Sequence, residues 1–152
     1  MTKAFDCAVR LLMRREHGMR ELTDKLIRKG YNREESAEAL VECQRLGLQS
    51  DERFVESLCN ARIRQGYGPL RISQELQAKH IARELINAML NQHQESWEEY
   101  ALIAWQKKFK QHEGLGVAEI QKQHRFLLYR GFSPDIIARL FKNNSHKSQS
   151  HA

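Results

Sequence analysis

The feature that most constrains this chain is that it repeats itself with a period of about fifty residues. Two shifts, of 50 and of 101 positions, superpose apolar residues: Leu22, Leu26, Tyr31 and Leu40 fall on Ile72, Leu76, Ile81 and Leu90, and Leu26, Tyr31 and Leu40 fall on Leu127, Phe132 and Phe141. Such self-similarity is typical of architectures in which similar units stack and bury their apolar faces against one another. The sequence therefore predicts three copies of one structural unit.

Each copy is expected to contain three helices. The first helices are predicted over residues 3–17, 51–65 and 97–111, because apolar side chains recur there at helical spacing. The second helices are predicted to begin at Met19, Pro69 and Val117. Two of them should end at Gly30 and Gly131, since glycine takes a left-handed cap conformation at little cost.

The third helices of the first and third copies carry N-terminal signals. Asn32 is followed three residues later by Glu35, which is the pattern of a capping box. Ser133 is followed by Pro134, and proline is favoured at the first position of a helix. Ser96 with Glu99 gives a similar signal at the start of the third copy. These signals thus place helix starts in the first and third copies.

These signals together predict an all-α fold, an elongated tandem array of three three-helix repeats. The 152 residues include only two prolines and eight glycines, which favours helix throughout. The predicted modules and the remaining segment are 1–49, 50–95, 96–143 and a disordered tail over 144–152. The residues just after the second helices, Tyr31, Ile81 and Phe132, are expected to fill the small core of each module.

Composition excludes several classes of function. No apolar run approaches the roughly 20 residues that a membrane-spanning helix needs, and the first residues do not resemble a secretory signal. Cys7, Cys43 and Cys59 match neither a disulfide framework nor a metal motif, so buried thiols are expected. No motif for catalysis, a cofactor or a metal is present. We therefore predict a monomeric, cytoplasmic, non-enzymatic protein without a membrane or cofactor partner.

Positive charge concentrates in the third copy. The formal net charge is +6, and residues 96–152 hold nine basic and five acidic residues. Six of these basic residues are candidates for contact with phosphate or another acidic surface: Lys107, Lys108, Lys110, Lys122, Arg125 and Arg130. The alternative is that they form a solvated helix face, and the sequence leaves both open.

A second basic cluster surrounds the turn of residues 66–69. Arg62, Arg64 and Arg71 flank this turn, whose two glycines permit close approach of another backbone. Contact with a partner is the favoured interpretation, and the alternative is that the turn only starts the second helix. Tyr67 could stack on a base or pack in the core, and we favour the core.

The same region carries a resemblance to a known protein family. The segments 50–55 (SDERFV) and 62–72 (RIRQGYGPLRI), followed by Glu75 and Leu76, resemble the central signature of the RecX family. Residues 11–31 of the first copy and 130–132 (RGF) of the third copy are also similar to that family. His80 departs from the glycine usual at its position, and Ser50 departs from the usual acidic residue.

The resemblance implies a function that the residue patterns alone do not identify. Proteins of this family regulate the RecA recombinase, by binding in the groove of its filament on single-stranded DNA. The resemblance implies that this chain is a RecA inhibitor. Such an inhibitor suppresses filament extension, ATP hydrolysis, strand exchange and stimulation of LexA cleavage, and it acts in the SOS response and DNA repair. The alternative is a nucleic-acid-binding helical repeat protein that only competes with RecA for single-stranded DNA.

Overall fold

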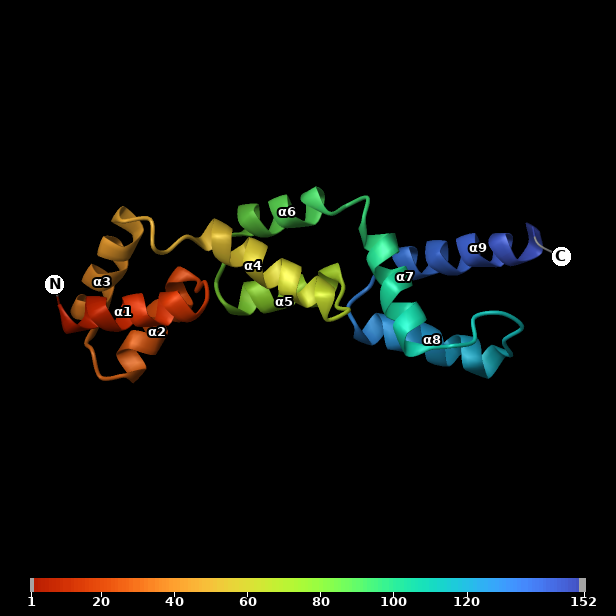
Figure 1. Ribbon diagram of the computed structural model, residues 1–152, viewed down its shortest axis with the longest axis horizontal. Coiled ribbons are helices and arrows are strands. Elements are labelled where there is room, and N and C mark those ends of the chain that lie inside the picture. Colours follow the sequence, from red (N-terminus) through yellow and green to blue (C-terminus); the bar gives the residue numbers. More distant parts are fainter. Residues whose placement is uncertain (1, 151–152) are drawn as a thin grey trace. The chain divides into compact units, whose positions relative to one another are not determined.

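The structure is a computed structural model that describes the backbone of residues 2–150 and the side chains of residues 2–144. Within these residues the fold is entirely helical, as predicted. The helices are α1 (Lys3–Arg14), α2 (Met19–Arg28), α3 (Arg33–Arg45), α4 (Asp51–Arg64), α5 (Pro69–Ala78), α6 (Arg83–Gln92), α7 (Trp97–Lys108), α8 (Val117–Tyr129) and α9 (Pro134–Ser150) (Figure 1). They form three sets of three in chain order.

The second helices begin where the sequence predicts, at the starts of α2, α5 and α8. Two of the first helices end three residues earlier than predicted, α1 at Arg14 and α7 at Lys108. In both cases the next residue leaves the helix in an extended conformation. In α7 this residue is Phe109, whose ring then packs edge-on against Phe126 with centroids 5.3 Å apart. The Phe109 ring thus packs against α8 at the point where α7 ends.

The ends of the second helices share one backbone conformation. Gly30 and Gly131 have φ angles of 106° and 98°, in the left-handed region that the sequence predicts for them. His80 stands at the same place in the second repeat and adopts φ of 60°. A residue with a Cβ atom pays about 1 to 2 kcal/mol for this conformation. The departure from glycine thus leaves the cap geometry in place at some cost in stability.

Two of the three predicted N-terminal signals act as caps. The Asn32 side chain accepts a hydrogen bond from the backbone N–H of Glu35 at 2.8 Å, and the capping box is complete. Ser133 Oγ accepts from the backbone N–H of Ile136 at 3.2 Å. Ser96 makes no capping hydrogen bond, because its backbone is already helical rather than extended. The prediction of α7's start is confirmed, but the prediction that Ser96 caps it is wrong.

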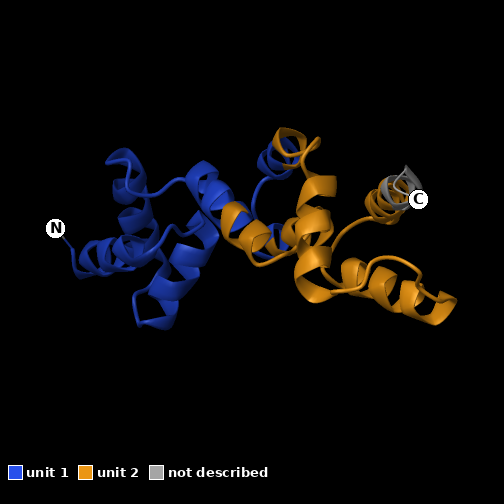
Figure 2. Cartoon of the chain, turned by 45° about the vertical axis from the view of Figure 1, so that its right-hand side comes forward, with its two compact units in different colours: residues 1–59, 76–89 blue, residues 60–75, 90–152 orange. Residues whose placement is uncertain are grey.

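The chain forms two compact units, which are described separately below. Unit 1 comprises residues 1–59 and 76–89, and unit 2 comprises residues 60–75 and 90–152 (Figure 2). The change from one unit to the other falls inside α4, α5 and α6, so the second repeat contributes to both. The repeats describe the periodicity of the sequence, whereas the units describe how the residues pack.

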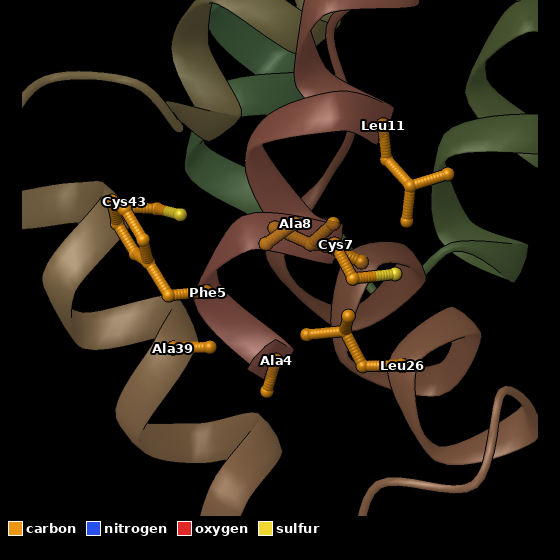
Figure 3. Packing of buried hydrophobic residues seen from close by; sticks show 9 residues of the cluster. Ala4, Phe5, Cys7, Ala8, Leu11, Leu26, Ala39 and Cys43 are labelled. Carbon is orange, nitrogen blue, oxygen red and sulfur yellow. The ribbon is translucent and has the colours of Figure 1, made fainter. Parts of the chain in front are cut away.

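The core of unit 1 is built around α1, α2 and α3. Small and apolar side chains of α1, among them Ala4, Phe5 and Ala8, pack against Leu26 and Ala39 (Figure 3). All three cysteines of the chain are buried as free thiols, as expected. Burial raises the pKa of the Cys59 thiol to about 11, so this sulfur stays protonated at neutral pH.

The core of unit 2 joins α7, α8 and α9. Trp105 is 1% exposed, and its indole N–H donates to the buried Gln123 side chain at 2.6 Å. The Gln123 amide in turn donates to the backbone carbonyl of Gln111 at 3.2 Å. This chain of hydrogen bonds satisfies two buried polar groups and ties the loop after α7 to α8.

The three residues predicted to fill the module cores differ in burial. Phe132 and Ile81 are buried, whereas Tyr31 is only partly buried and packs against the edge of the unit 1 core. The last helix, α9, extends to Ser150, and the disordered tail expected over residues 144–152 stays a prediction. Residues 151–152 of that tail lie outside the described residues.

None of the described helices combines the length and the apolar character that a membrane span needs.

Candidate interaction surface

The turn at residues 66–69 is a backbone junction between the second and third repeats, inside unit 2. The backbone N–H of Gly68 donates to the carbonyl of Arg130 at 2.6 Å, and that of Leu70 donates to the carbonyl of Gly131 at 2.9 Å. The first N–H groups of α5, which have no partner within the helix, are thus satisfied by the carbonyl end of α8. The prediction that Gly68 and Pro69 start a helix holds, and the turn also has this second structural role.

Steric constraints require glycine at both Gly68 and Gly131 of this junction. A Cβ atom on Gly68 would lie 2.6 Å from backbone atoms of Gly131. A Cβ atom on Gly131 would lie 2.5 Å from the Cβ atom of Arg71. No side-chain movement can relieve an overlap with backbone, so the two chain segments approach this closely only because both residues are glycine.

Beside the junction, cationic groups and aromatic rings alternate in what we call the cation–ring stack. Arg71 lies over the Tyr67 ring at 4.0 Å, and Arg130 lies 5.2 Å from the same ring. Arg130 also lies 4.9 Å from the Phe126 ring, and the Lys108 ammonium group lies 6.0 Å from that ring. Each contact is within the range of a cation–π interaction. Tyr67 is therefore half-buried and contacts two guanidinium groups.

The stack orders its cations without neutralising them. Arg71, Arg130 and Lys108 make no ion pair among the described residues, and the same is true of the neighbouring Arg64 and Lys107. The Arg130 guanidinium is fixed further by donating to the backbone carbonyl of Gln65 at 2.9 Å. A guanidinium that is held by rings and a carbonyl keeps its full charge, so this surface remains available to an anionic partner.

Arg62 differs from the other candidates in this region. Its guanidinium donates two hydrogen bonds to the Glu75 carboxylate, each 2.8 Å long. These hydrogen bonds raise the pKa of Arg62 above its ordinary value, in spite of partial burial. A bidentate pair of this kind fixes α4 against α5 within unit 2 and neutralises the charge. Arg62 is thus placed as a structural residue, although the sequence suggested contact with a partner.

A hollow of about 710 Å³ lies next to the stack, and we call it the unit 2 hollow. Its apolar walls include Ile63 at the end of α4 and Ile103 and Ala104 on α7. Its basic side chains are Arg64, Lys107, Lys108 and Arg130. Four of the ten candidates therefore line one concavity, and no acidic residue lies among the lining residues.

The remaining candidates lie outside the hollow. Lys110 is exposed in the loop after α7. Lys122 and Arg125 are exposed on α8, at a spacing that places them on the same face of the helix as Tyr129. Tyr129 is 82% exposed, and sequence reasoning missed it. The signal that could have identified it is a bulky aromatic residue seven positions after a lysine, on the face of α8 opposite the buried Leu127.

Unit 1 presents its charges differently. Glu21, whose side chain is 8% exposed, accepts from Arg15 at 2.7 Å and from Lys79 at 2.8 Å. Burial alone would raise the pKa of Glu21, but these hydrogen bonds outweigh it and lower the pKa to about 2. Arg53 is likewise paired with Glu16, at 3.1 Å. Glu21 and Glu16 therefore neutralise Arg15, Lys79 and Arg53 on unit 1.

A buried histidine lies beside this cluster. His17 is 1% exposed, with Nδ1 3.0 Å from the carbonyl oxygen of Arg15 and Nε2 3.0 Å from the Lys25 ammonium group. Burial lowers the pKa of His17, against the hydrogen bond to Arg15. Among the described residues, no group of three or more His, Cys, Asp or Glu side chains is arranged to hold a metal ion.

Comparison with known protein families gives one consistent result. Three family models match in succession: the first three-helix domain of RecX over residues 4–43, the second over residues 50–90 and the third over residues 96–141. The regulatory protein RecX of Legionella pneumophila (strain Corby) is 56% identical over 142 residues, which is 93% of this chain and 95% of that protein. The regulatory protein RecX of Pseudomonas fluorescens is 43% identical over 133 residues, 88% of this chain and 86% of that protein.

The fold also matches solved structures. The crystal structure of RecX from Lactobacillus salivarius superposes with a TM-score of 0.76 at 20% identity, and the match covers 93% of this chain and 94% of that one. At this identity the likeness concerns the fold alone.

Proposed function

This chain belongs to the RecX family of regulatory proteins, and from that premise we propose that it is a negative regulator of the RecA recombinase. In this proposal the protein binds the groove of the RecA filament on single-stranded DNA. It then inhibits filament extension, ATP hydrolysis, strand exchange and the stimulation of LexA cleavage. It acts in the cytoplasm as a monomer, by binding and without catalysing a reaction.

The observation that supports this proposal is a group of cations in unit 2 that make no ion pair among the described residues. Arg64, Arg71, Lys107, Lys108 and Arg130 are candidates for contact with acidic groups of the filament, whether protein or phosphate. Three similar repeats in one chain also offer more than one contact to a polymer of identical subunits. Linked contacts bind more tightly than separate ones, because the second contact forms at high effective concentration.

A second candidate function rests on the exposed face of α8. Lys122, Arg125 and Tyr129 combine two cations with a free aromatic ring, which is the chemistry that holds single-stranded nucleic acid without sequence preference. In this alternative the protein lowers RecA activity only by occupying the DNA. The two functions differ in what happens when DNA is abundant.

The experiment is a measurement of DNA-dependent ATP hydrolysis by RecA. We expect substoichiometric protein to slow hydrolysis, and to do so even when single-stranded DNA is in large excess over both proteins. Inhibition that disappears as DNA is added would identify competition for DNA instead. Hydrolysis that is unaffected at equimolar protein and low salt would contradict both functions.

A further inference from the structure

The unit 2 hollow combines two chemistries in one concavity. Ile103 is 45% exposed, and it stands with Ile63 and Ala104 in the hollow wall. The Lys107 and Lys108 side chains follow Ile103 by about one turn of α7, and Arg64 lies at the end of α4. An occupant that fits both features must carry apolar surface and negative charge together.

The charge of the hollow has one sign. None of its lining residues is acidic, and its four cations make no ion pair among the described residues. Complementarity of charge therefore requires an anionic occupant, because a cationic one would add to the repulsion between these groups. The volume of about 710 Å³ lies within the range of pockets that hold small ligands or a few side chains.

Two classes of anionic occupant have apolar surface, namely single-stranded nucleic acid and an acidic peptide segment. Binding of a base needs an aromatic ring with a free face. The Phe126 ring already faces Arg130 at 4.9 Å and meets the edge of Phe109. The Tyr100 ring packs edge-on against Trp97 at 5.6 Å and lies 5.9 Å from the His93 ring. Ile103 is exposed, whereas Tyr100 and Phe126 are half-buried, so the wall suits an aliphatic side chain better than a base.

We propose that the unit 2 hollow is the docking site for an acidic peptide segment of a partner protein, which inserts an aliphatic side chain against Ile63, Ile103 and Ala104. The carboxylates that flank this side chain pair with Arg64, Lys107, Lys108 and Arg130 at the rim. An apolar anchor surrounded by charge pairs is the usual anatomy of a small protein interface. This inference rests on the proposed function, since it supplies the chemistry of the protein contact that the function requires.

The test is selection of a phage library of random linear peptides on the full-length protein. Three variants accompany the wild type. Ile103→Glu adds a negative charge to the apolar wall, and Val117→Glu is its matched control, because Val117 is also exposed and apolar but lies outside the hollow. The double variant Lys107→Ala/Lys108→Ala removes two rim charges and leaves the wall intact. Circular dichroism verifies that each variant is folded.

The proposal predicts that the selected peptides combine acidic residues with at least one aliphatic residue. Their affinity, measured by fluorescence anisotropy, should fall at least about tenfold with Ile103→Glu and with Lys107→Ala/Lys108→Ala, and should remain unchanged with Val117→Glu. Selection of peptides that lack acidic residues, or binding that Ile103→Glu leaves intact, would overturn the proposal. A third result would also overturn the proposal: no peptide is selected, and a fluorescent oligothymidylate binds the wild type but not Ile103→Glu. Nucleic acid would then be the occupant of the hollow.

The outcome can be separated from that of the proposed function. Peptide binding is measured without RecA, and inhibition of RecA is measured with the wild-type protein and without peptide. Inhibition without peptide selection would remove this inference alone, and peptide selection without inhibition would remove the proposed function alone.

Discussion

Gly18 and Gly68 occupy the same position of successive repeats, yet the chain completes the two helix starts in different ways. After Gly18, the backbone N–H of Met19 donates to the Asp51 carboxylate at 2.8 Å. At Gly68, the backbone N–H donates to the carbonyl of Arg130 at 2.6 Å. The first junction, in unit 1, depends on a charged side chain, whereas the second, in unit 2, depends on backbone alone.

The difference extends to the charges around each junction. Near the first, carboxylates of Glu16 and Glu21 pair with arginine and lysine side chains. Near the second, Arg71 and Arg130 are ordered by aromatic rings. Arg62 beside the second junction is paired with Glu75, whereas Arg71 and Arg130 make no ion pair among the described residues. The two junctions therefore differ in how the neighbouring cations are held, by carboxylates at the first and by aromatic rings at the second.

The largest effect is expected from a methyl group at the second junction. Gly68→Ala places a Cβ atom 2.6 Å from the Gly131 backbone, and we expect it to lower the free energy of unfolding by about 3 kcal/mol. Gly18→Ala is the matched control, because its Cβ atom meets only the Phe54 and Ile81 side chains, at 3.3 Å. It should cost about 1 kcal/mol or less. Urea denaturation checks both values, and equal costs would remove the distinction between the junctions.

Acid is expected to destabilise unit 1 more than unit 2, where burial lowers the pKa of His124 but no carboxylate has its pKa lowered as strongly as Glu21 in unit 1. Glu21 has its pKa lowered to about 2 from an ordinary value of 4.5, so its contribution to stability is present above pH 4.5 and is lost as the pH falls toward 2. His17 has its pKa lowered from 6.5, so its contribution is present above pH 6.5 and is lost as the pH falls below that value. The free energy of unfolding of unit 1 should therefore decrease as the pH falls below 6.5, and decrease further as it falls below 4.5.

The two tryptophans make this order measurable, because both Trp97 and Trp105 belong to unit 2. On acidification, helix content from circular dichroism should decrease before tryptophan fluorescence changes. Glu21→Gln should lower stability at neutral pH by about 2 kcal/mol and flatten the pH dependence below pH 4.5. Fluorescence that changes first would show that acid acts on unit 2 instead.

The smallest effect is expected from the exposed ion pair of unit 1. Arg53→Gln removes the contact with Glu16 at 3.1 Å and should cost about 0.5 kcal/mol at low salt. The cost should shrink in roughly 1 M salt, where charges on the surface are screened. Arg10→Gln is the control for loss of a surface arginine, because Arg10 is exposed on α1 and makes no ion pair among the described residues. A cost that salt leaves unchanged would mean that Arg53 acts through its hydrogen bond to the Gly47 carbonyl.

The sequence was sufficient to predict the repeats and most helix boundaries, because periodicity and capping are local properties. It also placed Lys107, Lys108 and Arg130 in one basic region. The sequence could not predict the ion pair between Arg62 and Glu75, because these residues are 13 positions apart and lie on two different helices. It could not predict the contact between Gly68 and Gly131, since two glycines 63 positions apart carry no signal of proximity. The unit 2 hollow depends on the same long-range packing, so the sequence could not predict it either.

We propose that the cations of unit 2 that make no ion pair among the described residues contact the RecA filament. The most direct test of this claim compares Lys107→Glu/Lys108→Glu with Arg10→Glu/Arg14→Glu, a control that changes charge equally on exposed residues of α1. The measured quantity is inhibition of DNA-dependent ATP hydrolysis by RecA. The account predicts that the unit 2 variant loses inhibition while the α1 variant retains it. Equal inhibition by the two folded variants would contradict the account.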